Sequence, residues 1–599
     1  MKTQKSKKTG AENIRWDLSD LFDGISDPRI ETILEKGQKQ AKQFVKIYKG
    51  NLQGITPRNL QGAFKKYEEI LSHLYRVSQY SHLVYSTDTS NDKTKALMSH
   101  VDDVLSHISN TLVFFTLELG NLPEKVFSKF SKKDVMGPYT YSVEMIRKNA
   151  TYKLSEKEEQ VINLKDLTGA DAFQKLYSDL TSSFQFALSI EGTQKKMNGS
   201  ELRALRQHPH ASVRRRAMRL FFSKYQDHEM IITHIFNNTL KDHHTEMTLR
   251  GYKNPIDMMN TSNDLDSNVV QLLHEVTSQS YPLVHKYYKL KAKLMKMKRL
   301  TLADIYAPLP ASNTEYSWTE AKDIVLDAFQ SFDTDYYNMA KRMFDRKRID
   351  APIQKTKRGG AYCSSSTPDL DPYVFLNFLG KQRDVSTMAH ELGHAIHDIL
   401  CSHQTLVSYH PILPLAETAS VFSEMIVTDK LLKEVTDKKS KISLLTDKLE
   451  DIFATSHRQN MFSHFEMSAH KAVGKGRVTG PEFSALYQSE LKKMFGNAVS
   501  YTDEYNWEWS SIPHFIDVPF YVYAYNFGNL LVMALYQQYL EEGAHFVPKF
   551  KQFLSMGSIA SPKEITGLVN ANISSPTFWK KSILYIESLL KQLDELVND

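Results

Sequence analysis

The residues most able to do chemistry are two histidines four positions apart with a glutamate between them: His390, Glu391 and His394 in the segment HELGH. On a helix, residues four apart lie about 40° apart and one turn along, so both imidazoles can face one metal ion. Glu391 projects about 100° away from His390 and can reach a water at the metal without being a ligand. The spacing therefore predicts a zinc site with Glu391 as general base, against the alternative of a polar helix face with incidental histidines.

The surrounding segment is predicted to be a helix that begins with Asp384 as its N-cap and runs to about Cys401. Its apolar residues share the face opposite the two histidines: Val385, Met388, Ala389, Leu392, Ile396, Ile399 and Leu400. His397 lies on the histidine side, but about 10.5 Å along the axis from His390, too far to bind the same ion. For His397 we expect a water, a supporting contact or exposure, and Cys401 is excluded as a ligand for the same reason.

A catalytic zinc usually has three protein ligands and an open position, so another segment must supply the third. The segment LPLAETASVFSEM offers Glu417, and Pro414 marks the start of a helix there. On that helix Glu417, Ser420 and Glu424 fall on one side. From spacing alone, Glu417 can be either the third ligand or a solvated carboxylate.

Helical patterning dominates the chain, with apolar residues at spacings of three and four, as in residues 31–50 and 96–120. A short aromatic run at residues 372–380 is the main strand candidate, and the Gly/Ser-rich residues 358–371 before it indicate a hairpin or loop. We therefore expect a mainly α fold with a small β-sheet near the zinc helix. A polar stretch at 191–212 predicts an N-terminal helical region over 1–200 and a catalytic region over 201–599.

The composition argues against several partners. The 75 basic and 69 acidic residues nearly balance, and part of the excess lies in the N-terminal tail MKTQKSKK, so no nucleic-acid partner is expected. The longest apolar stretch, Leu530 to Leu535, is far too short to cross a membrane. Two cysteines in 599 residues and no apolar segment after the basic start favour a cytoplasmic protein. The oligomeric state stays open.

The motifs AHELGHAIH and ETASVFSE together resemble the thimet-oligopeptidase-like zinc metallopeptidases, and within them the oligoendopeptidase F group. The likeness extends to IRWDLSDLF, RGGAYC and WSSIPHFIDVPFYVYAYNFG. It implies one zinc ion per chain held by His390, His394 and Glu417, with Glu424 in a supporting position. It also implies a two-lobed helical shell around a deep active-site channel, and cleavage of short peptides rather than folded proteins.

The C-terminal part of this likeness contains hydrogen-bond donors that could stabilise a tetrahedral oxyanion: His514 and one of Tyr521, Tyr523 or Tyr525. Each tyrosine could instead be a core residue. A helix starting near here would place Tyr521 and Tyr525 on one face and Tyr523 on another. Tyr525 is therefore the first choice and Tyr523 the reserve.

The function predicted is a zinc metalloendopeptidase that hydrolyses internal bonds of short oligopeptides through a zinc-activated water, with Glu391 as general base. One alternative is a metallo-carboxypeptidase or dipeptidase on the same fold. Another is a non-catalytic peptide-binding protein, which the intact set of His390, Glu391 and His394 argues against.

Overall fold

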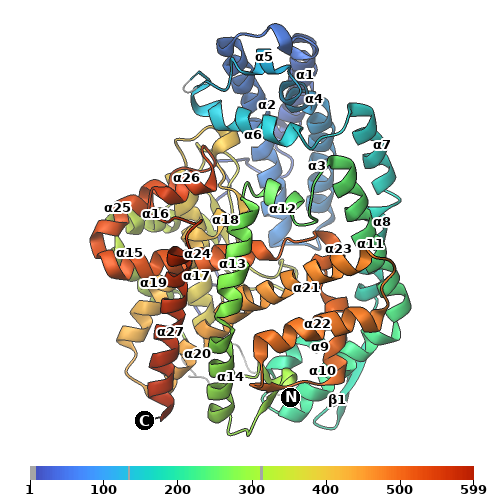
Figure 1. The fold of residues 1–599 in the computed structure, drawn as a ribbon. Helices are drawn as coiled ribbons and strands as arrows, with labels where there is room; N and C mark the ends of the chain where they lie inside the picture. The colour runs from blue at the N-terminus through green and yellow to red at the C-terminus, as the bar shows by residue number, and fades with distance from the viewer. Residues whose placement is uncertain (1–7, 133–134, 310–314, 599) are drawn as a thin grey trace. The chain divides into compact units, whose positions relative to one another are not determined.

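The computed structural model of the chain describes residues 8–132, 135–309 and 315–598, so residues 1–7 of the basic tail lie outside the described residues. The described chain is mostly helical (Figure 1), and it divides into two compact units. Unit 1 comprises Met1–Thr151, Asn313–Glu434 and Gln538–Asn572, and unit 2 comprises Tyr152–Ser312, Val435–Gln537 and Ile573–Asp599. The mainly α fold with small sheets is therefore confirmed. The predicted division at residues 200 and 201 falls within unit 2, inside a helix, and stays a prediction.

Unit 1 holds the helices at the start of the chain and those of the HELGH region. They are α1 (Pro28–Tyr48), α2 (Pro57–Thr87), α3 (Asp92–Leu112), α4 (Phe114–Gly120), α5 (Glu124–Phe127), α6 (Thr140–Ala150), α15 (Trp318–Phe332), α16 (Thr334–Asp345), α17 (Gln382–Leu400), α18 (Leu413–Ala416), α19 (Thr418–Glu434), α25 (Phe546–Leu554) and α26 (Pro562–Gly567). Proline in the first turn and a capping side chain start both long helices: the Asp27 carboxylate accepts from the Arg29 N–H, and the Thr56 hydroxyl from the Asn59 N–H.

A three-stranded sheet in unit 1 supports α17, the helix that carries the HELGH motif. Strand β6 (Tyr373–Phe375) lies in the middle, parallel to β4 (Ile349–Asp350) and antiparallel to β5 (Tyr362–Ser364). The side chains of β6 are fully buried, as expected for an aromatic central strand, and α17 packs against both β5 and β6. The predicted strand at 372–380 and the hairpin before it are thus present, although the strand itself is shorter.

Unit 2 holds the remaining helices. They are α7 (Glu156–Asp166), α8 (Ala170–Ser182), α9 (Gly199–Ala204), α10 (Ala211–Asp227), α11 (Glu229–Arg250), α12 (Asp257–Ser262), α13 (Ser267–Gln279), α14 (Tyr281–Leu294), α20 (Lys438–Ile452), α21 (Arg458–Val473), α22 (Gly480–Phe495), α23 (His514–Asp517), α24 (Tyr523–Glu542), whose last residues belong to unit 1, and α27 (Pro576–Asn598). Helices α21 and α22 run side by side (Figure 1) and pack against each other. An antiparallel hairpin, β1 (Phe186–Ile190) and β2 (Thr193–Met197), and a parallel pair, β3 (Leu300–Thr301) and β7 (Val499–Ser500), complete the unit.

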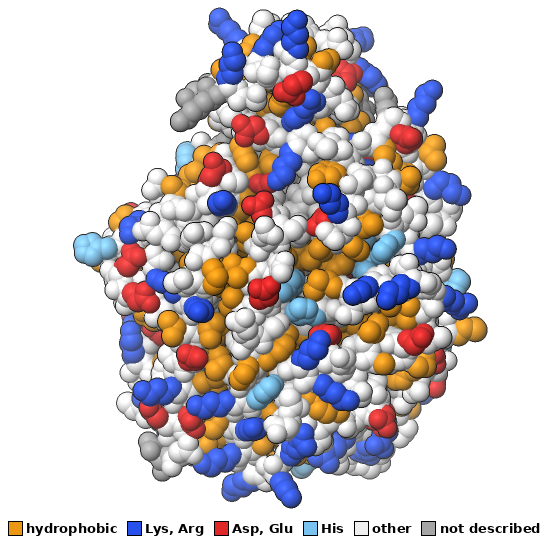
Figure 2. Space-filling model, in the orientation of Figure 1, with side chains coloured by type: hydrophobic (Ala, Val, Ile, Leu, Met, Phe, Trp, Pro, Cys, Tyr) orange, Lys and Arg blue, Asp and Glu red, His pale blue; other side chains and the backbone are white. Residues whose placement is uncertain are grey.

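The surface carries mixed charge. On the face drawn in Figure 2, basic and acidic side chains are interspersed, in keeping with the nearly balanced composition. Among the residues that the structure describes, no helix is both long and apolar enough to cross a bilayer.

Candidate metal centre

Helix α17 carries the three residues of the HELGH motif. It begins at Gln382, two residues before the predicted N-cap, and Asp384 instead accepts hydrogen bonds from the backbone N–H groups of Lys381 and Leu379. Asp384 is therefore the third residue of the helix, and its carboxylate caps the N-terminus by accepting these hydrogen bonds from within the first turn. The side chains of the predicted apolar face are buried as far as Ile396, while His390 and His394 stay partly exposed on the other side.

Helix α19 approaches α17 very closely at Gly393, the residue directly before His394 in the motif. A Cβ atom at this position would lie 2.6 Å from both the carbonyl oxygen of Ala419 and the Cα of Ser420. Only glycine allows such an approach of two helices. The residue just before α19 is Glu417, so this contact brings its carboxylate to the two histidines.

His390, His394 and Glu417 converge on one point. The Oε2 atom of Glu417 lies 3.2 Å from Nε2 of His390 and 3.3 Å from Nε2 of His394. One ligand atom from each residue lies within 4.8 Å of the other two, and no other group of three such residues among those the structure describes does so. Two imidazole nitrogens and one carboxylate are a donor set that catalytic zinc uses, with a position left open. The residues present therefore fit a zinc ion.

Two neighbouring side chains orient these donors. Nδ1 of His390 donates to Oε1 of Glu424 at 2.6 Å, so Nε2 is the ring nitrogen that faces Oε2 of Glu417. The Ser420 hydroxyl donates to Oε2 of Glu417 at 2.7 Å. The predicted polar stripe of Glu417, Ser420 and Glu424 thus acts together around His390.

Hydrogen bonding dominates the electrostatics of the cluster. Burial alone would lower the pKa of His390, but its bonds to Glu417 and Glu424 outweigh burial and hold the pKa well above the ordinary value. Burial would likewise raise the pKa of Glu417, yet its bonds to His390 and His394 hold that pKa well below the usual range. Glu417 is therefore ionised, as a metal ligand must be.

Glu391 lies beside the cluster but is not part of it. Its side chain is 5% exposed, and burial raises its pKa, against the lowering effect of the nearby His390 and His394. A carboxylate whose pKa moves upward becomes a stronger base at neutral pH, which suits proton abstraction from a water.

His397 and Cys401 do not join the metal donors. Both are buried, and His397 faces the backbone carbonyls of Ala416 and Leu554. Burial lowers the pKa of His397 to about 3, so the ring is neutral. The expectation that His397 is exposed to solvent is therefore wrong, because its side chain is buried against the backbone of Ala416, directly before Glu417.

The aromatic residues singled out near the C-terminus belong to unit 2, where three of them gather. The rings of His514 and Tyr521 lie parallel with centroids 5.9 Å apart, and the ring of Tyr525 stands edge-on to both. The Tyr525 hydroxyl is 3.4 Å from Nε2 of His514. All three side chains are partly exposed, and burial lowers the pKa of His514. We call this group the His514 cluster.

Tyr523 lies apart from the His514 cluster. Its side chain is fully buried, and its hydroxyl accepts a hydrogen bond of 2.9 Å from Nδ2 of Asn263. Helix α24 begins at Tyr523, so Tyr521 and Tyr525 lie on one side and Tyr523 on the other. Because Tyr523 is buried, Tyr521 replaces it as the second candidate, after Tyr525, for the tyrosine that donates to the oxyanion. The sequence gives no sign of the Asn263 contact, because the partner is 260 residues away.

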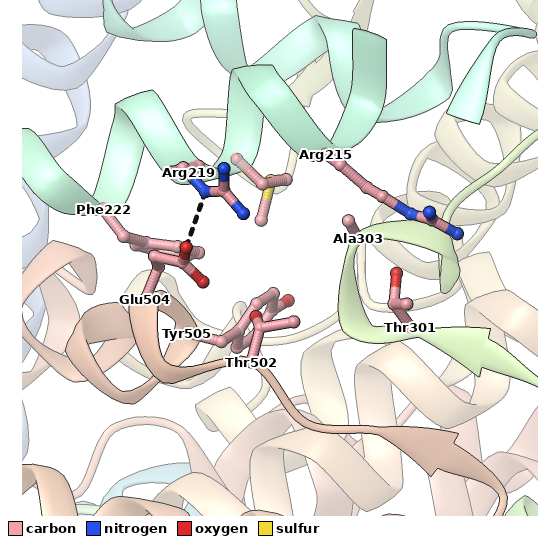
Figure 3. Close-up of a pocket in the computed structure, with 9 residues that line it drawn as sticks. Arg215, Arg219, Phe222, Thr301, Ala303, Thr502, Glu504 and Tyr505 are labelled. Carbon is pink, nitrogen blue, oxygen red and sulfur yellow. Dashed lines mark hydrogen bonds and ion pairs between the residues drawn. The ribbon is translucent and has the colours of Figure 1, made fainter. Parts of the chain in front are cut away.

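Unit 2 also has a small pocket beside α10, lined by apolar residues such as Phe222 and Ala303 as well as by polar and charged ones (Figure 3). Nε of Arg219 lies 2.6 Å from Oε1 of Glu504, and Nη2 of Arg215 lies 3.6 Å from Oδ2 of Asp304. Both arginines are thus already paired with carboxylates, and we assign no ligand to this pocket.

Comparison with known proteins identifies the protein family of the chain. Residues 204–584 match the family model described as Peptidase family M3, and residues 118–186 match the model Oligopeptidase F. Oligopeptidase PepF of Bacillus subtilis is 25% identical over 97% of this chain and 87% of its own length. The chromosomal oligoendopeptidase F of Lactococcus lactis subsp. cremoris is 26% identical over 99% of both chains. The crystal structure of oligoendopeptidase-F from Enterococcus faecium has a TM-score of 0.72 at 21% identity and covers 95% of this chain and 99% of its own.

These matches confirm the resemblance drawn from AHELGHAIH and ETASVFSE, and the predicted enzyme class with it. The family model covers well over half of the chain, including the HELGH segment and the His514 cluster. The chain therefore belongs to peptidase family M3 and is a metallopeptidase.

Proposed function

We propose that the chain is a zinc-dependent endopeptidase that cleaves internal bonds of short peptides. The observation that carries this proposal is the convergence of His390, His394 and Glu417, with the buried carboxyl of Glu391 beside them. The family match supports peptide substrates, and the relatives named oligopeptidase and oligoendopeptidase support short ones.

His390, His394 and Glu417 are the proposed ligands of one zinc ion. When bound there, zinc supplies Lewis acidity, which lowers the pKa of a water and polarises the scissile carbonyl. Glu424 fixes the tautomer of His390 through the bond to Nδ1, and Ser420 holds the Glu417 carboxylate in place. Together these bonds orient two of the three donors, those of His390 and Glu417.

Glu391 is the proposed general base. It takes the proton of the attacking water and returns it to the nitrogen of the leaving amine as the peptide bond breaks. Its burial next to His390 and His394 supports this role, because burial raises the pKa of Glu391 and so makes its carboxylate a stronger base.

His514 and Tyr525 are proposed to donate hydrogen bonds to the oxyanion that forms on the scissile carbonyl, with Tyr521 in reserve. Their contacts within the His514 cluster support this role, because each ring restricts the orientation of the others. Tyr523 is left out of the proposal since its hydroxyl is already bonded in the core.

The deciding experiment is product analysis by mass spectrometry on a peptide of about ten residues that is blocked at both ends. Internal cleavage that a chelator abolishes and zinc restores is the expected result. A carboxypeptidase or dipeptidase would leave the blocked peptide intact while cutting its unblocked form. Binding of the peptide without any turnover of either form would indicate a non-catalytic peptide-binding protein.

A further inference from the structure

A buried glutamate in α21 holds the turn that leads into the His514 cluster. Glu466 is 1% exposed, and its Oε1 atom accepts a hydrogen bond of 2.8 Å from the backbone N–H of Phe520. The two residues are 54 positions apart, and both belong to unit 2. Buried carboxyl groups are costly unless they serve a bond that the fold needs. The bond of Glu466 goes to a backbone amide rather than to an opposite charge.

Phe520 is the unusual residue of that turn. Its φ is +62°, in the left-handed region that side chains other than glycine rarely adopt. Such a conformation persists only where the surroundings hold it in place. Two residues of α21 contact Phe520. The Glu466 carboxyl accepts from its backbone N–H, and the ring of His470, one helical turn further on, stacks on its phenyl ring with centroids 4.7 Å apart.

This turn connects the parts of the His514 cluster. His514 opens α23, Phe520 follows that helix, and Tyr521 and Tyr525 come directly after. The left-handed residue therefore sets the direction in which the chain returns, and with it the parallel placement of Tyr521 against His514. A turn that relaxed to ordinary backbone angles would rotate both tyrosines away from their present positions.

The Glu466 carboxyl suits a neutral acceptor role. Burial raises the pKa of Glu466 to about 8, against the lowering effect of the Phe520 N–H, so the group is mostly protonated at neutral pH. A glutamine amide has nearly the same shape and keeps the acceptor oxygen, whereas methionine has similar length but no comparable acceptor. Comparing the two replacements therefore distinguishes the effect of the hydrogen bond from the effect of side-chain volume.

We propose that Glu466 is a positioning residue for the reaction, acting through the Phe520 amide to hold Tyr521 and Tyr525 against His514. This inference rests on the proposed function, in which the His514 cluster supplies hydrogen bonds to the oxyanion. It assigns no contact between Glu466 and the substrate.

The test compares steady-state kinetics of Glu466→Met and Glu466→Gln in the full-length, zinc-loaded enzyme. Glu466→Met should lower kcat by up to about 10²-fold with little change in KM, and Glu466→Gln should restore kcat. In a Tyr525→Phe background, Glu466→Met should add little further loss, because both changes act on the same donor. Glu450→Ala, which removes another carboxylate of unit 2 that bonds Tyr287, is the control for lowered stability and should keep kcat.

Phe520→Gly provides a second route if Glu466→Met does not fold, because glycine adopts this φ without strain but also leaves it freely. It should lower kcat and be non-additive with Tyr525→Phe. Wild-type kcat in folded Glu466→Met, or in Phe520→Gly, would overturn the positioning role. If instead His514→Ala and Tyr525→Phe themselves behave like wild type, the proposed function of the cluster is at fault.

Discussion

Nδ1 of His390 donates a hydrogen bond to Oε1 of Glu424 at 2.6 Å, across the close contact between α17 and α19. The bond occupies Nδ1 of His390, so Nε2, which faces Glu417, is the nitrogen that we expect to bind a metal. It also gives Glu424 a different task from Glu417, although both carboxylates lie beside the same imidazole.

Removal of these two carboxylates should therefore have unequal effects. Glu417→Ala should cause a large loss of bound zinc, because it removes one of three donors. Glu424→Ala should weaken zinc binding or activity by roughly 10–100-fold, as is usual for a residue that orients a ligand. Zinc affinity measured by competition with a chelator checks both. Glu434→Ala, at the last residue of α19, is the matched control. The reverse order of the two losses would show that the ligand is Glu424.

Gly393→Ala should separate α19 from α17. The added methyl group would meet the Ala419 carbonyl oxygen and the Ser420 Cα at 2.6 Å, and neither backbone atom can move without shifting the helix. Overpacking of this kind costs about 1–3 kcal/mol, and the shift should also weaken zinc binding. Thermal unfolding and zinc titration measure the two effects.

The matched control for this change is Gly62→Ala. Gly62 lies within α2, and a Cβ there would meet no atom within 4 Å. Alanine should leave zinc binding unchanged and stabilise the helix by up to about 1 kcal/mol. If Gly393→Ala were as benign as Gly62→Ala, the close helix contact would not be what places Glu417.

Three substitutions should distinguish the residues of the His514 cluster, which we propose act in catalysis, from Tyr523, which packs in the core. His514→Ala and Tyr525→Phe should each lower kcat more than they raise KM, with zinc still bound, because the lost bond forms mainly in the transition state. A single oxyanion donor is worth about 2.7–4 kcal/mol by this measure. Tyr523→Phe should instead cost about 1 kcal/mol of stability through the lost Asn263 bond and leave kcat intact. A fall in kcat for Tyr523→Phe alone would reverse the assignment.

Stability should respond to pH through Glu466. Its pKa rises from the ordinary 4.5 to about 8 on folding, so between these values the folded chain binds more protons than the unfolded chain. The stability that this group contributes is therefore fully present below pH 4.5 and is lost as the pH rises toward 8. Glu466→Gln cannot ionise, so its melting temperature should match wild type in acid and exceed it increasingly up to about pH 8. A constant difference across this range would contradict the assignment.

Part of the site could be predicted from the sequence because it depends on helical spacing. His394 follows His390 by four positions, which places both on one face of any α-helix, and the seven-residue spacing of Glu417 and Glu424 works in the same way. The tertiary contacts could not be predicted in this way. Nothing local indicates that Gly393 touches Ala419, that Asn263 bonds Tyr523, or that Glu466 bonds Phe520.

The fold shows the same limit. Apolar periodicity predicts helices but not their neighbours, so it indicated a mainly α chain without showing that each unit is assembled from three separate stretches. The small sheet could be predicted because the sequence of β6 is a short aromatic run, whereas its partner β4 has only two residues and no recognisable pattern.

Zinc content and turnover of Glu391→Gln, measured on the same preparation, test the central claim most directly. His390, His394 and Glu417 are intact in this variant, so we expect it to hold one zinc ion per chain, the same as we expect of wild type. With the general base removed, kcat should fall by at least about 10²–10⁴-fold. Near-normal turnover would contradict the role of Glu391 as base, and loss of the zinc would contradict the ligand set.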